Sequence, residues 1–554
     1  MVSNGHQHNN MTELDTFLPQ DGSNIKDGIQ AGKYKVTVSP AKTKDVELQE
    51  QLKMEKGYWD PFKERKNDNP TTDCDTLTHL LKASLGTGIL AMPIAFKSSG
   101  LSFGILCTIL VALVCTHCSY IVVKCAHVLY YRVRVSTMSY ADVGEVAFAN
   151  GPPWGRKFAK LARISILGGL FAAYFGTCSV YTVIISRNFQ QVVDYYLGIE
   201  TNERIYIASL LIPLILISWV PDLKALAPFS MVANLFMGLG LGITFYYLVF
   251  DLPAPSTRPQ IGELMALPQF FSISIFAMEA IGVVMPLENA MKTPTHFIGI
   301  CGVLNQGMGG VTLIYILLGF LGYLKYGDET LGSITLNLDI SLLPAQLVKI
   351  LIGLGVLCTY GLQYYVCLEI VWNGLKDRYK HNARFYEYVV RTVLTTVAVL
   401  LAVAVPTIGP FLGLIGALCF SILGLIIPVF IEIVTFWDIG FGPCNWLIWK
   451  NILVLIFGVM ALIFGSYTSI LDIIEMYSPK DDILTALTNS TVISANETSS
   501  VMYEVAKNLT DILPKNLTDV LPKNLTDLLA TNATEILSNV PSIISKVFNS
   551  TNLR

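Results

Sequence analysis

The sequence predicts an all-α polytopic membrane protein with about 11 transmembrane helices, and composition and segment length both indicate it. Of 554 residues, 53% are hydrophobic and only 14% are charged, with a mean hydropathy of +0.53. A soluble protein of this length is much less apolar. From about residue 75, segments long enough to cross a bilayer follow one another. We expect the spans at 76–97, 102–125, 162–186, 205–220, 229–250, 267–290, 296–324, 342–373, 387–406, 411–435 and 451–474.

Three domains follow from this pattern. Residues 1–74 are polar and without periodicity, which predicts a disordered cytosolic N-terminal tail, and they lack the apolar segment of a signal peptide. Residues 75–477 form the membrane domain, with a first half at about 75–250, a second half at about 265–435 and an extra helix at about 451–474. Residues 478–554 form a C-terminal repeat tail.

Basic residues set the predicted orientation. The loops after the second and eighth spans are rich in lysine and arginine, whereas the loop at 251–267 contains only Arg258 and the loop at 326–341 contains none. The positive-inside rule places the basic loops and the N-terminus in the cytosol. An odd number of spans then places the C-terminus outside the cell or in a lumen.

The repeat tail provides an independent indication of this topology. The sequence Lys507–Pro514 recurs almost unchanged from Lys515 and from Lys523, and each unit carries an Asn-x-Thr sequon. Dense sequons are expected in a segment exposed to the glycosylation machinery. We therefore expect glycans here, although low-complexity repeats can also generate sequons by chance. The predicted sites are Asn489, Asn496, Asn508, Asn516, Asn524, Asn532 and Asn549.

The first span contains helix-breaking residues in its middle. Gly86, Gly88 and Pro93 weaken the helix there, and backbone freed within a membrane must be buried in protein or line a cavity. His79 lies on the same helix face as Lys82 and Gly86, about 10 Å along the axis from the break. A histidine near neutrality is suited to carry a proton. It could equally be an interfacial side chain that reaches water, with the glycines serving close helix packing.

The sixth span has a matching interruption. Glu279 lies near its middle, followed by Gly282 and Pro286, and a carboxylate at that depth costs about 2.5–3.5 kcal/mol. The first and sixth spans enter from opposite sides in the predicted topology. Paired discontinuous helices of this kind are typical of the two inverted five-helix halves of secondary transporters.

Such a site suits an amino acid. Amides freed around Gly86, Thr87 and Gly88 would favour a carboxylate. Carbonyls of the sixth span, with Ser272 or Ser274 nearby, would accept an ammonium group. Phe276 could cover the substrate or could simply pack. Glu279 could carry a proton or could hold its helix through hydrogen bonds.

Other features are less informative. The eleven cysteines predict no structural disulfide, because those in spans read as small apolar packing residues. Polar side chains in the eighth and tenth spans favour a pathway, although helix–helix hydrogen bonds explain them nearly as well. They are Tyr360, Gln363, Tyr364, Glu369 and Glu432. No metal-ligand spacing, nucleophile motif or phosphate-binding loop is present, so we predict no enzyme and no cofactor beyond the proton as coupling ion.

Four separated motifs resemble the proton-coupled amino-acid transporters of the amino acid/auxin permease superfamily, with insect-type members most similar. They lie at Thr76–Phe96, Phe276–Met291, Gly332–Leu338 and Pro406–Pro428. The resemblance covers residues 74–477. It implies a LeuT-like 5+5 inverted repeat plus one extra helix.

The resemblance also implies functional residues. The family's proton-coupling histidine falls on His79, its glycine pair on Gly86 and Gly88, and its sixth-span glutamate on Glu279. The family usually has Glu-Gly where this chain has Glu279-Ala280. The predicted substrate-binding residues are Ser84, Gly86, Thr87, Gly88, Ser272, Ser274 and Phe276, and the predicted proton-coupling residues are His79 and Glu279.

The expected function is proton-coupled symport of small neutral amino acids, such as alanine, glycine or proline, by alternating access. The alternative is an amino-acid sensor that signals to growth control with little net flux. The expected partners are the amino acid, the proton and membrane lipid, with no nucleic acid and an unknown oligomeric state. The expected location is the plasma membrane or a lysosomal or endosomal membrane.

Overall fold

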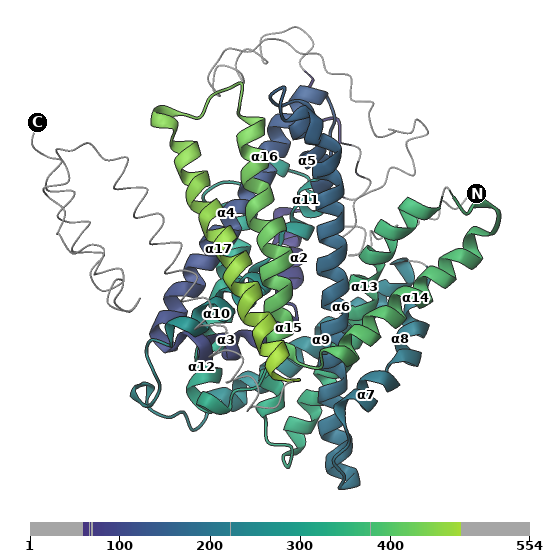
Figure 1. Ribbon diagram of the computed structural model, residues 1–554, viewed down its shortest axis with the longest axis vertical. Coiled ribbons are helices and arrows are strands. Elements are labelled where there is room, and N and C mark those ends of the chain that lie inside the picture. Colours follow the sequence, from purple (N-terminus) through teal and green to yellow (C-terminus); the bar gives the residue numbers. More distant parts are fainter. Residues whose placement is uncertain (1–58, 66, 68–69, 222, 377, 478–554) are drawn as a thin grey trace, which may run out of the picture. The chain divides into compact units, whose positions relative to one another are not determined.

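The computed structural model describes residues 59–65, 67, 70–221, 223–376 and 378–477. The described residues up to Ile473 belong to one compact unit, and the structure describes only 474–477 of the second unit, 474–554. The described part is helical apart from one isolated β-bridge, as predicted (Figure 1). The predicted tail at 1–58 and the repeat tail with its seven sequons lie outside the described residues.

The first five spans match their predicted positions. The first is divided into α2 (Asp73–Ser84), the short turn η1 (Thr87–Ala91) and α3 (Met92–Ser99). It is followed by α4 (Leu101–Val133), the connecting helix α5 (Tyr140–Ala149) and α6 (Ala159–Leu197). The fourth span consists of two short helices, α7 (Glu203–Ser209) and α8 (Leu211–Ser218), and the fifth is α9 (Leu223–Val249).

The sixth span is also divided, into α10 (Leu267–Met278) and α11 (Ile281–Ala290). The next three are α12 (Val303–Tyr326), α13 (Leu343–Leu375) and α14 (Ala383–Ala404). The tenth combines α15 (Ile408–Ile415), the π-helix η9 (Gly416–Ile426) and α16 (Ile427–Thr435), and the eleventh is α17 (Trp446–Glu475).

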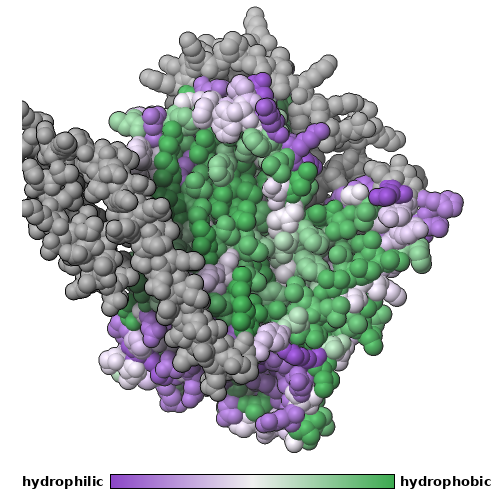
Figure 2. Space-filling view, in the orientation of Figure 1, coloured by the Kyte–Doolittle hydropathy of each residue, from purple (hydrophilic) through white to green (hydrophobic). Residues whose placement is uncertain are grey.

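Ten of these segments are long and apolar enough to cross a membrane when α2 and α3 are taken as one bent span. The one remaining predicted span, the fourth, consists of α7 and α8, which are separated at Leu210 and are each too short to count by length alone. In Figure 2, hydrophobic side chains cover the middle of the helices, and hydrophilic ones gather toward both ends. Below, the inner side is the side predicted to be cytosolic, and the outer side is opposite to it.

Both predicted interruptions are present. The axes of α2 and η1–α3 differ by 45°, and Leu85 and Gly86 between them have non-helical backbone. In the sixth span the backbone is extended at Glu279, so that α10 ends at Met278. The π-helix in the tenth span was not predicted, because its sequence is uniformly apolar and contains no feature that distinguishes a π-helix from an α-helix.

The N-terminal boundary of the membrane domain requires a correction. Residues 59–65 and 67, assigned from sequence to a disordered tail, lie against the helices instead, with Phe62 and Arg65 in contact with α4 and α11. Composition misled here because the segment is polar, yet its polar groups find partners in the folded protein. All eleven cysteines lie in the described part of the chain, and each has a free thiol there.

Candidate functional site

A cavity of about 180 Å³ lies where the first and sixth spans are interrupted. Its lining includes residues 82–88 of the first span, and residues 276, 277, 279, 280, 282 and 283 of the sixth. α6, α9, α13 and η9 complete the wall. The first- and sixth-span residues come mainly from the breaks and their inner flanks, so the cavity extends from the middle of the bundle toward the inner side.

The two interrupted helices meet closely at Gly88. A Cβ atom at this position would lie 2.8 Å from the Cα atom of Ala277, which is shorter than any acceptable contact. Glycine therefore permits the approach of the first span to the end of α10. The amides of Thr87 and Gly88 begin the η1 turn, and the first amides of a helical turn have no partner within it.

Tyr315 of α12 joins the inner half of the first span to the outer half of the sixth at the two breaks. Its hydroxyl lies within hydrogen-bonding distance of the carbonyl oxygens of Ser84, at 2.5 Å, and Ala277, at 3.1 Å. Ser84 is the last residue of α2, and Ala277 lies one residue before the end of α10. Helix C-termini carry partial negative charge on such carbonyls, so one hydroxyl proton stabilises two helix ends that would otherwise repel each other.

Glu279 lies in a space that only glycine leaves open. Its Oε1 atom accepts a hydrogen bond from the amide of Ile281 at 2.7 Å. Its Oε2 atom is buried and has no hydrogen-bond partner among the described residues. A Cβ atom on Gly424 of η9 would lie 1.7 Å from Oε2, so the absence of a side chain at Gly424 accommodates the carboxyl group.

Aromatic and polar side chains complete the cavity. Phe276 contacts Phe420 of η9 edge to face, with ring centroids 5.7 Å apart. Across the cavity, the side-chain amide of Gln363 donates to the Tyr181 hydroxyl at 3.5 Å. The lining carries one basic side chain, Lys82, and one acidic side chain, Glu279. An acidic and a basic side chain thus border the same cavity.

The structure brings most of the predicted site residues together. Ser84, Gly86, Thr87, Gly88, Phe276 and Glu279 line the cavity. His79 does not line it and lies half-buried on α2 toward the inner side.

Ser272 and Ser274 are fully buried away from the cavity, which corrects the expectation that they bind substrate. Ser272 packs against Gly465 of α17 and Gly416 of η9, because α10 turns this face toward the tenth and eleventh spans.

The polar side chains noted in the eighth and tenth spans have different environments. Gln363 lines the cavity. The Tyr364 hydroxyl instead donates to the carbonyl oxygen of Arg391, and Glu432 forms an ion pair of 2.6 Å with Lys450. Helix–helix contacts therefore account for Tyr364 and Glu432, which is the alternative that the sequence left open.

Sequence reasoning missed Tyr315 and Lys349. A tyrosine in an apolar span has no distinguishing signal, because its role depends on carbonyls of two other spans. Lys349 did have a distinguishing signal in the sequence, because a lysine within a long apolar segment is rare and usually functional. Among the described residues, no group of three or more histidine, cysteine or acidic side chains is arranged to hold a metal ion.

Lys349 connects the outer parts of three elements. Its side chain is fully buried on α13 and donates to Gln191 Oε1 of α6 at 2.8 Å and to the carbonyl oxygen of Thr335 at 2.6 Å. Thr335 belongs to the outer turn η7 (Ile334–Asn337), and its hydroxyl donates to Asn188 Oδ1 of α6 at 3.0 Å. This turn lies against η1, α6 and α13, and its Ile334 packs near Pro93 and Gly322.

Comparisons with known proteins assign the chain to a family. Residues 70–471 match the family model described as "Transmembrane amino acid transporter protein". The chain is 57% identical over 483 residues to the "Proton-coupled amino acid transporter-like protein pathetic" of Drosophila melanogaster, covering 87% of this chain and 99% of that one. It is 26% identical to "Amino acid transporter AVT3C" of Arabidopsis thaliana, over 72% of this chain and 91% of that one.

Similar solved structures include two transporters. One is Mhp1, a nucleobase-cation-symport-1 family transporter in a closed conformation, with a TM-score of 0.42 and 13% identity, over 74% of this chain and 95% of that one. The other is MhsT in complex with L-phenylalanine, with a TM-score of 0.37 and 14% identity, over 74% of this chain and 99% of that one.

Proposed function

The chain belongs to the transmembrane amino acid transporter family, and is a transporter rather than an enzyme. From this premise we propose that it carries out proton-coupled symport of small neutral amino acids by alternating access. The observation that carries the proposal is the cavity at the two helix breaks, which Glu279 lines together with residues of the interrupted backbone. The name of the Drosophila relative supports proton coupling.

In this proposal the substrate carboxylate binds to the first span. The amides of Thr87 and Gly88 lie at the start of η1, where a negative group is favoured. Lys82 lines the same cavity and adds a positive charge. Ser84 offers a buried hydroxyl that has no hydrogen-bond partner among the described residues.

The substrate ammonium group binds toward the sixth span. The Tyr315 hydroxyl has a single proton, so it can donate to only one of the carbonyl oxygens of Ser84 and Ala277 at any moment. The other carbonyl oxygen is then available to accept a hydrogen bond from the substrate. An ammonium group provides three donors. The cavity is smaller than the range of about 300–1,000 Å³ typical for drug-sized ligands, and Phe276 and Phe420 restrict it, which favours a short side chain.

Glu279 carries the coupled proton in this mechanism. An ionised Oε2 in its buried position has no partner among the described residues, and an unpaired buried charge is costly. Protonation removes that charge, so proton binding and occupancy of the neighbouring cavity become linked. His79, about 10 Å inward along α2 from Gly86, is proposed to pass the proton to or from the cytosol.

The topology and location are part of the proposal. The basic loops and N-terminus face the cytosol, and the repeat tail is glycosylated on the opposite side. The plasma membrane and the lysosomal or endosomal membrane both fit this arrangement. Glycosidase treatment should increase the gel mobility of the chain purified from animal cells, and substitution of all seven sequon asparagines by glutamine should abolish that shift.

Transport by the purified full chain in vesicles tests the central proposal. Uptake of labelled alanine is measured with and without an inward proton gradient, and unlabelled glycine, proline, leucine and glutamate are added as competitors. Accumulation that requires the gradient and is blocked by glycine and proline would support the proposal. Binding of alanine without accumulation would overturn symport in favour of the sensor, and gradient-independent uptake would overturn proton coupling.

A further inference from the structure

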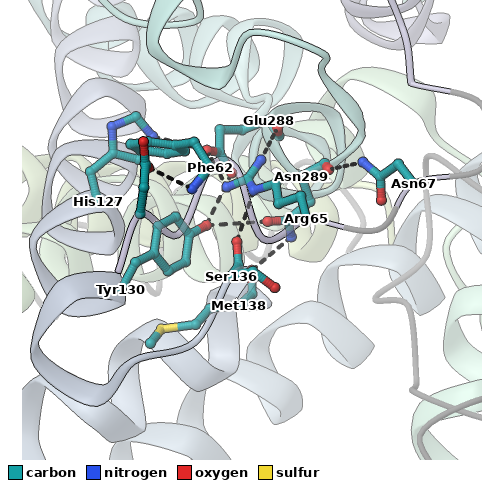
Figure 3. Close-up of polar contacts among 10 residues, drawn as sticks. Phe62, Arg65, Asn67, His127, Tyr130, Ser136, Met138, Glu288 and Asn289 are labelled. Carbon is teal, nitrogen blue, oxygen red and sulfur yellow. Dashed lines mark hydrogen bonds and ion pairs between the residues drawn. The ribbon is translucent and has the colours of Figure 1, made fainter. Parts of the chain in front are cut away.

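A short segment before the first span is anchored on the inner side of the protein. Figure 3 shows Arg65 between two parts of the chain, the end of α11 and the loop after α4. Its side chain is only 4% exposed although the surrounding sequence is polar. A buried cation outside the cavity requires an explanation that the transport mechanism above does not give.

Arg65 makes three bonds of the same length to fixed oxygen atoms. It donates from Nε to the carbonyl oxygen of Ser136, from Nη1 to the carbonyl oxygen of Glu288 and from Nη2 to Glu288 Oε1, each at 2.8 Å. The planar guanidinium group can form such a fork, and a lysine cannot. The three bonds join the inner end of the sixth span to the loop between α4 and α5.

Two other side chains form hydrogen bonds with the same Glu288 carboxylate. His127 and Tyr130 of α4 contact Glu288 at 2.9 and 3.0 Å (Figure 3). The ring of Phe62 lies edge-on to His127 and Tyr130, and the guanidinium group of Arg65 lies 5.3 Å from the centre of the Tyr130 ring. The Arg65 cluster, comprising Phe62, Arg65, His127, Tyr130 and Glu288, is therefore a complete network with a buried charge pair.

The chain connects this cluster directly to the first span. Thr71 pairs with the segment after α11, with its amide donating to Ala290 and its carbonyl oxygen accepting from the amide of Lys292, both at 2.9 Å. α2 begins two residues later, at Asp73. The position of α2 is thus tied through Thr71 and Arg65 to α11 and α4.

The cavity borders the end of α2 at Lys82–Ser84. This helix packs against α11 and α12, whereas the cavity lies between its residues Lys82–Ser84 and the residues Asn234 of α9 and Val366 of α13. Movement of α2 toward α9 and α13 would close the cavity from the inner side. The bonds of Arg65 and Thr71 hold α2 away from that position.

We propose that Arg65 is a positioning residue of the transport cycle that holds the first span in the conformation with the cavity open to the inner side. The inference rests on the proposed alternating access, but it concerns a conformational equilibrium and can be measured without substrate or proton. Release of Arg65 from Glu288 is required for the inner side to close. Arg65 and Thr71 then link the start of α2 to α4 and α11, which stabilises that conformation.

Thiol labelling of the full chain tests this proposal. Exposed Cys74, Cys301 and Cys444 are replaced by serine, and V366C is introduced in the cavity wall. A membrane-impermeant maleimide is applied to inside-out vesicles, with Arg65 either retained or replaced in R65Q. We expect labelling of V366C to slow at least about fivefold in R65Q, the lower end of typical coupling between conformational states.

Two control variants and a reciprocal position complete the experiment. K63Q removes an exposed cation two residues away and should not change the labelling rate. R65K, which keeps the charge but not the fork, should give an intermediate rate and tests the proposal if R65Q fails to reach the membrane. In right-side-out vesicles, I94C in the outer half of the first span should label faster in R65Q. Unchanged or faster labelling of V366C would overturn the proposal, as would slower labelling at both positions.

Discussion

Glu279 shows how one residue depends on the neighbouring chain. The extended backbone at this position ends α10, and the carboxyl group accepts a hydrogen bond from the amide of Ile281 at the start of α11. The same side chain fills the space left at Gly424 and lines the cavity. The hydrogen bond from Ile281 to Oε1 corresponds to one of the two alternatives from sequence, and the proton-carrying alternative stays a prediction that concerns the buried Oε2.

Replacement of Glu279 by glutamine separates transport from proton coupling. Glutamine retains the acceptor for Ile281 but cannot release a proton, so E279Q should exchange labelled alanine across the membrane without accumulating it in response to a proton gradient. E369Q, in the eighth span and outside the cavity lining, is the matched control and should retain accumulation. Gradient-driven accumulation by E279Q would show that the proton is carried elsewhere, and H79A is then the next variant to measure.

Tyr315 leads to a second residue-scale prediction. Y315F keeps the ring but removes the proton shared by the Ser84 and Ala277 carbonyls. Interhelical hydrogen bonds in membranes contribute about 0.6–1.7 kcal/mol, so KM for alanine should rise roughly threefold to twentyfold. Y323F, on the same helix and also buried, should leave KM within twofold. An unchanged KM in Y315F would mean that the two helix ends need no shared donor.

At the scale of elements, η9 explains how a carboxyl group fits within the bundle. A π-helix widens the backbone locally and commonly occurs at functional sites. The Tyr140 hydroxyl donates to the carbonyl oxygen of Leu423 at 2.6 Å, next to Gly424, and satisfies a backbone group in this region. The tenth span therefore provides, at Gly424, the space that the Glu279 carboxyl group occupies at the break in the sixth span.

This arrangement predicts that a single methyl group at position 424 is disruptive. In G424A the new Cβ atom would overlap Glu279 Oε2, and overpacking typically costs about 1–3 kcal/mol. The melting temperature in detergent should fall, and proton-driven uptake should fall further than exchange because Glu279 is displaced. G238A on α9 is the control, since nothing lies within 4 Å of a Cβ atom there. Equal melting temperatures for G424A and G238A would contradict the predicted contact.

At the scale of the whole membrane unit, buried cations lie toward both ends of the transport pathway. Lys349 holds the outer turn η7 onto α6 and α13, and Arg65 holds the inner start of the first span. Alternating access requires each end to open in turn. Lys349 connects outer elements in a structure whose cavity extends inward, so we expect its bonds to disfavour opening of the outer side.

Removal of the outer contact should therefore open the outer side. In K349Q the carbonyl oxygen of Thr335 loses a charged donor, and hydrogen bonds to charged groups contribute about 1.5–3 kcal/mol. An outer-half cysteine, I94C, should react faster with an impermeant maleimide in right-side-out vesicles. K97Q serves as the control, because Lys97 is another outer cation and donates to the carbonyl oxygen of Asp328. Equal rates for K349Q and K97Q would show that Lys349 has no specific role in closure.

The sequence alone determined where the long apolar helices lie and where two of them break. Both follow from local chemistry, because a bilayer requires long apolar segments and Gly86, Gly88 and Glu279 are costly within them. The positions of Ser84, Thr87 and Phe276 at the cavity follow from their nearness to these breaks.

Only the tertiary structure decided which side chains meet. The helical faces of Ser272 and Ser274, the partners of Tyr315 and the position of Arg65 depend on contacts between residues about 40 to more than 220 positions apart in the chain. In an apolar span nearly every face is hydrophobic, so the pattern that orients a helix in a soluble protein is absent. Hydrogen bonds and small residues at helix contacts fix the orientation instead, and they become visible only when the helices are assembled.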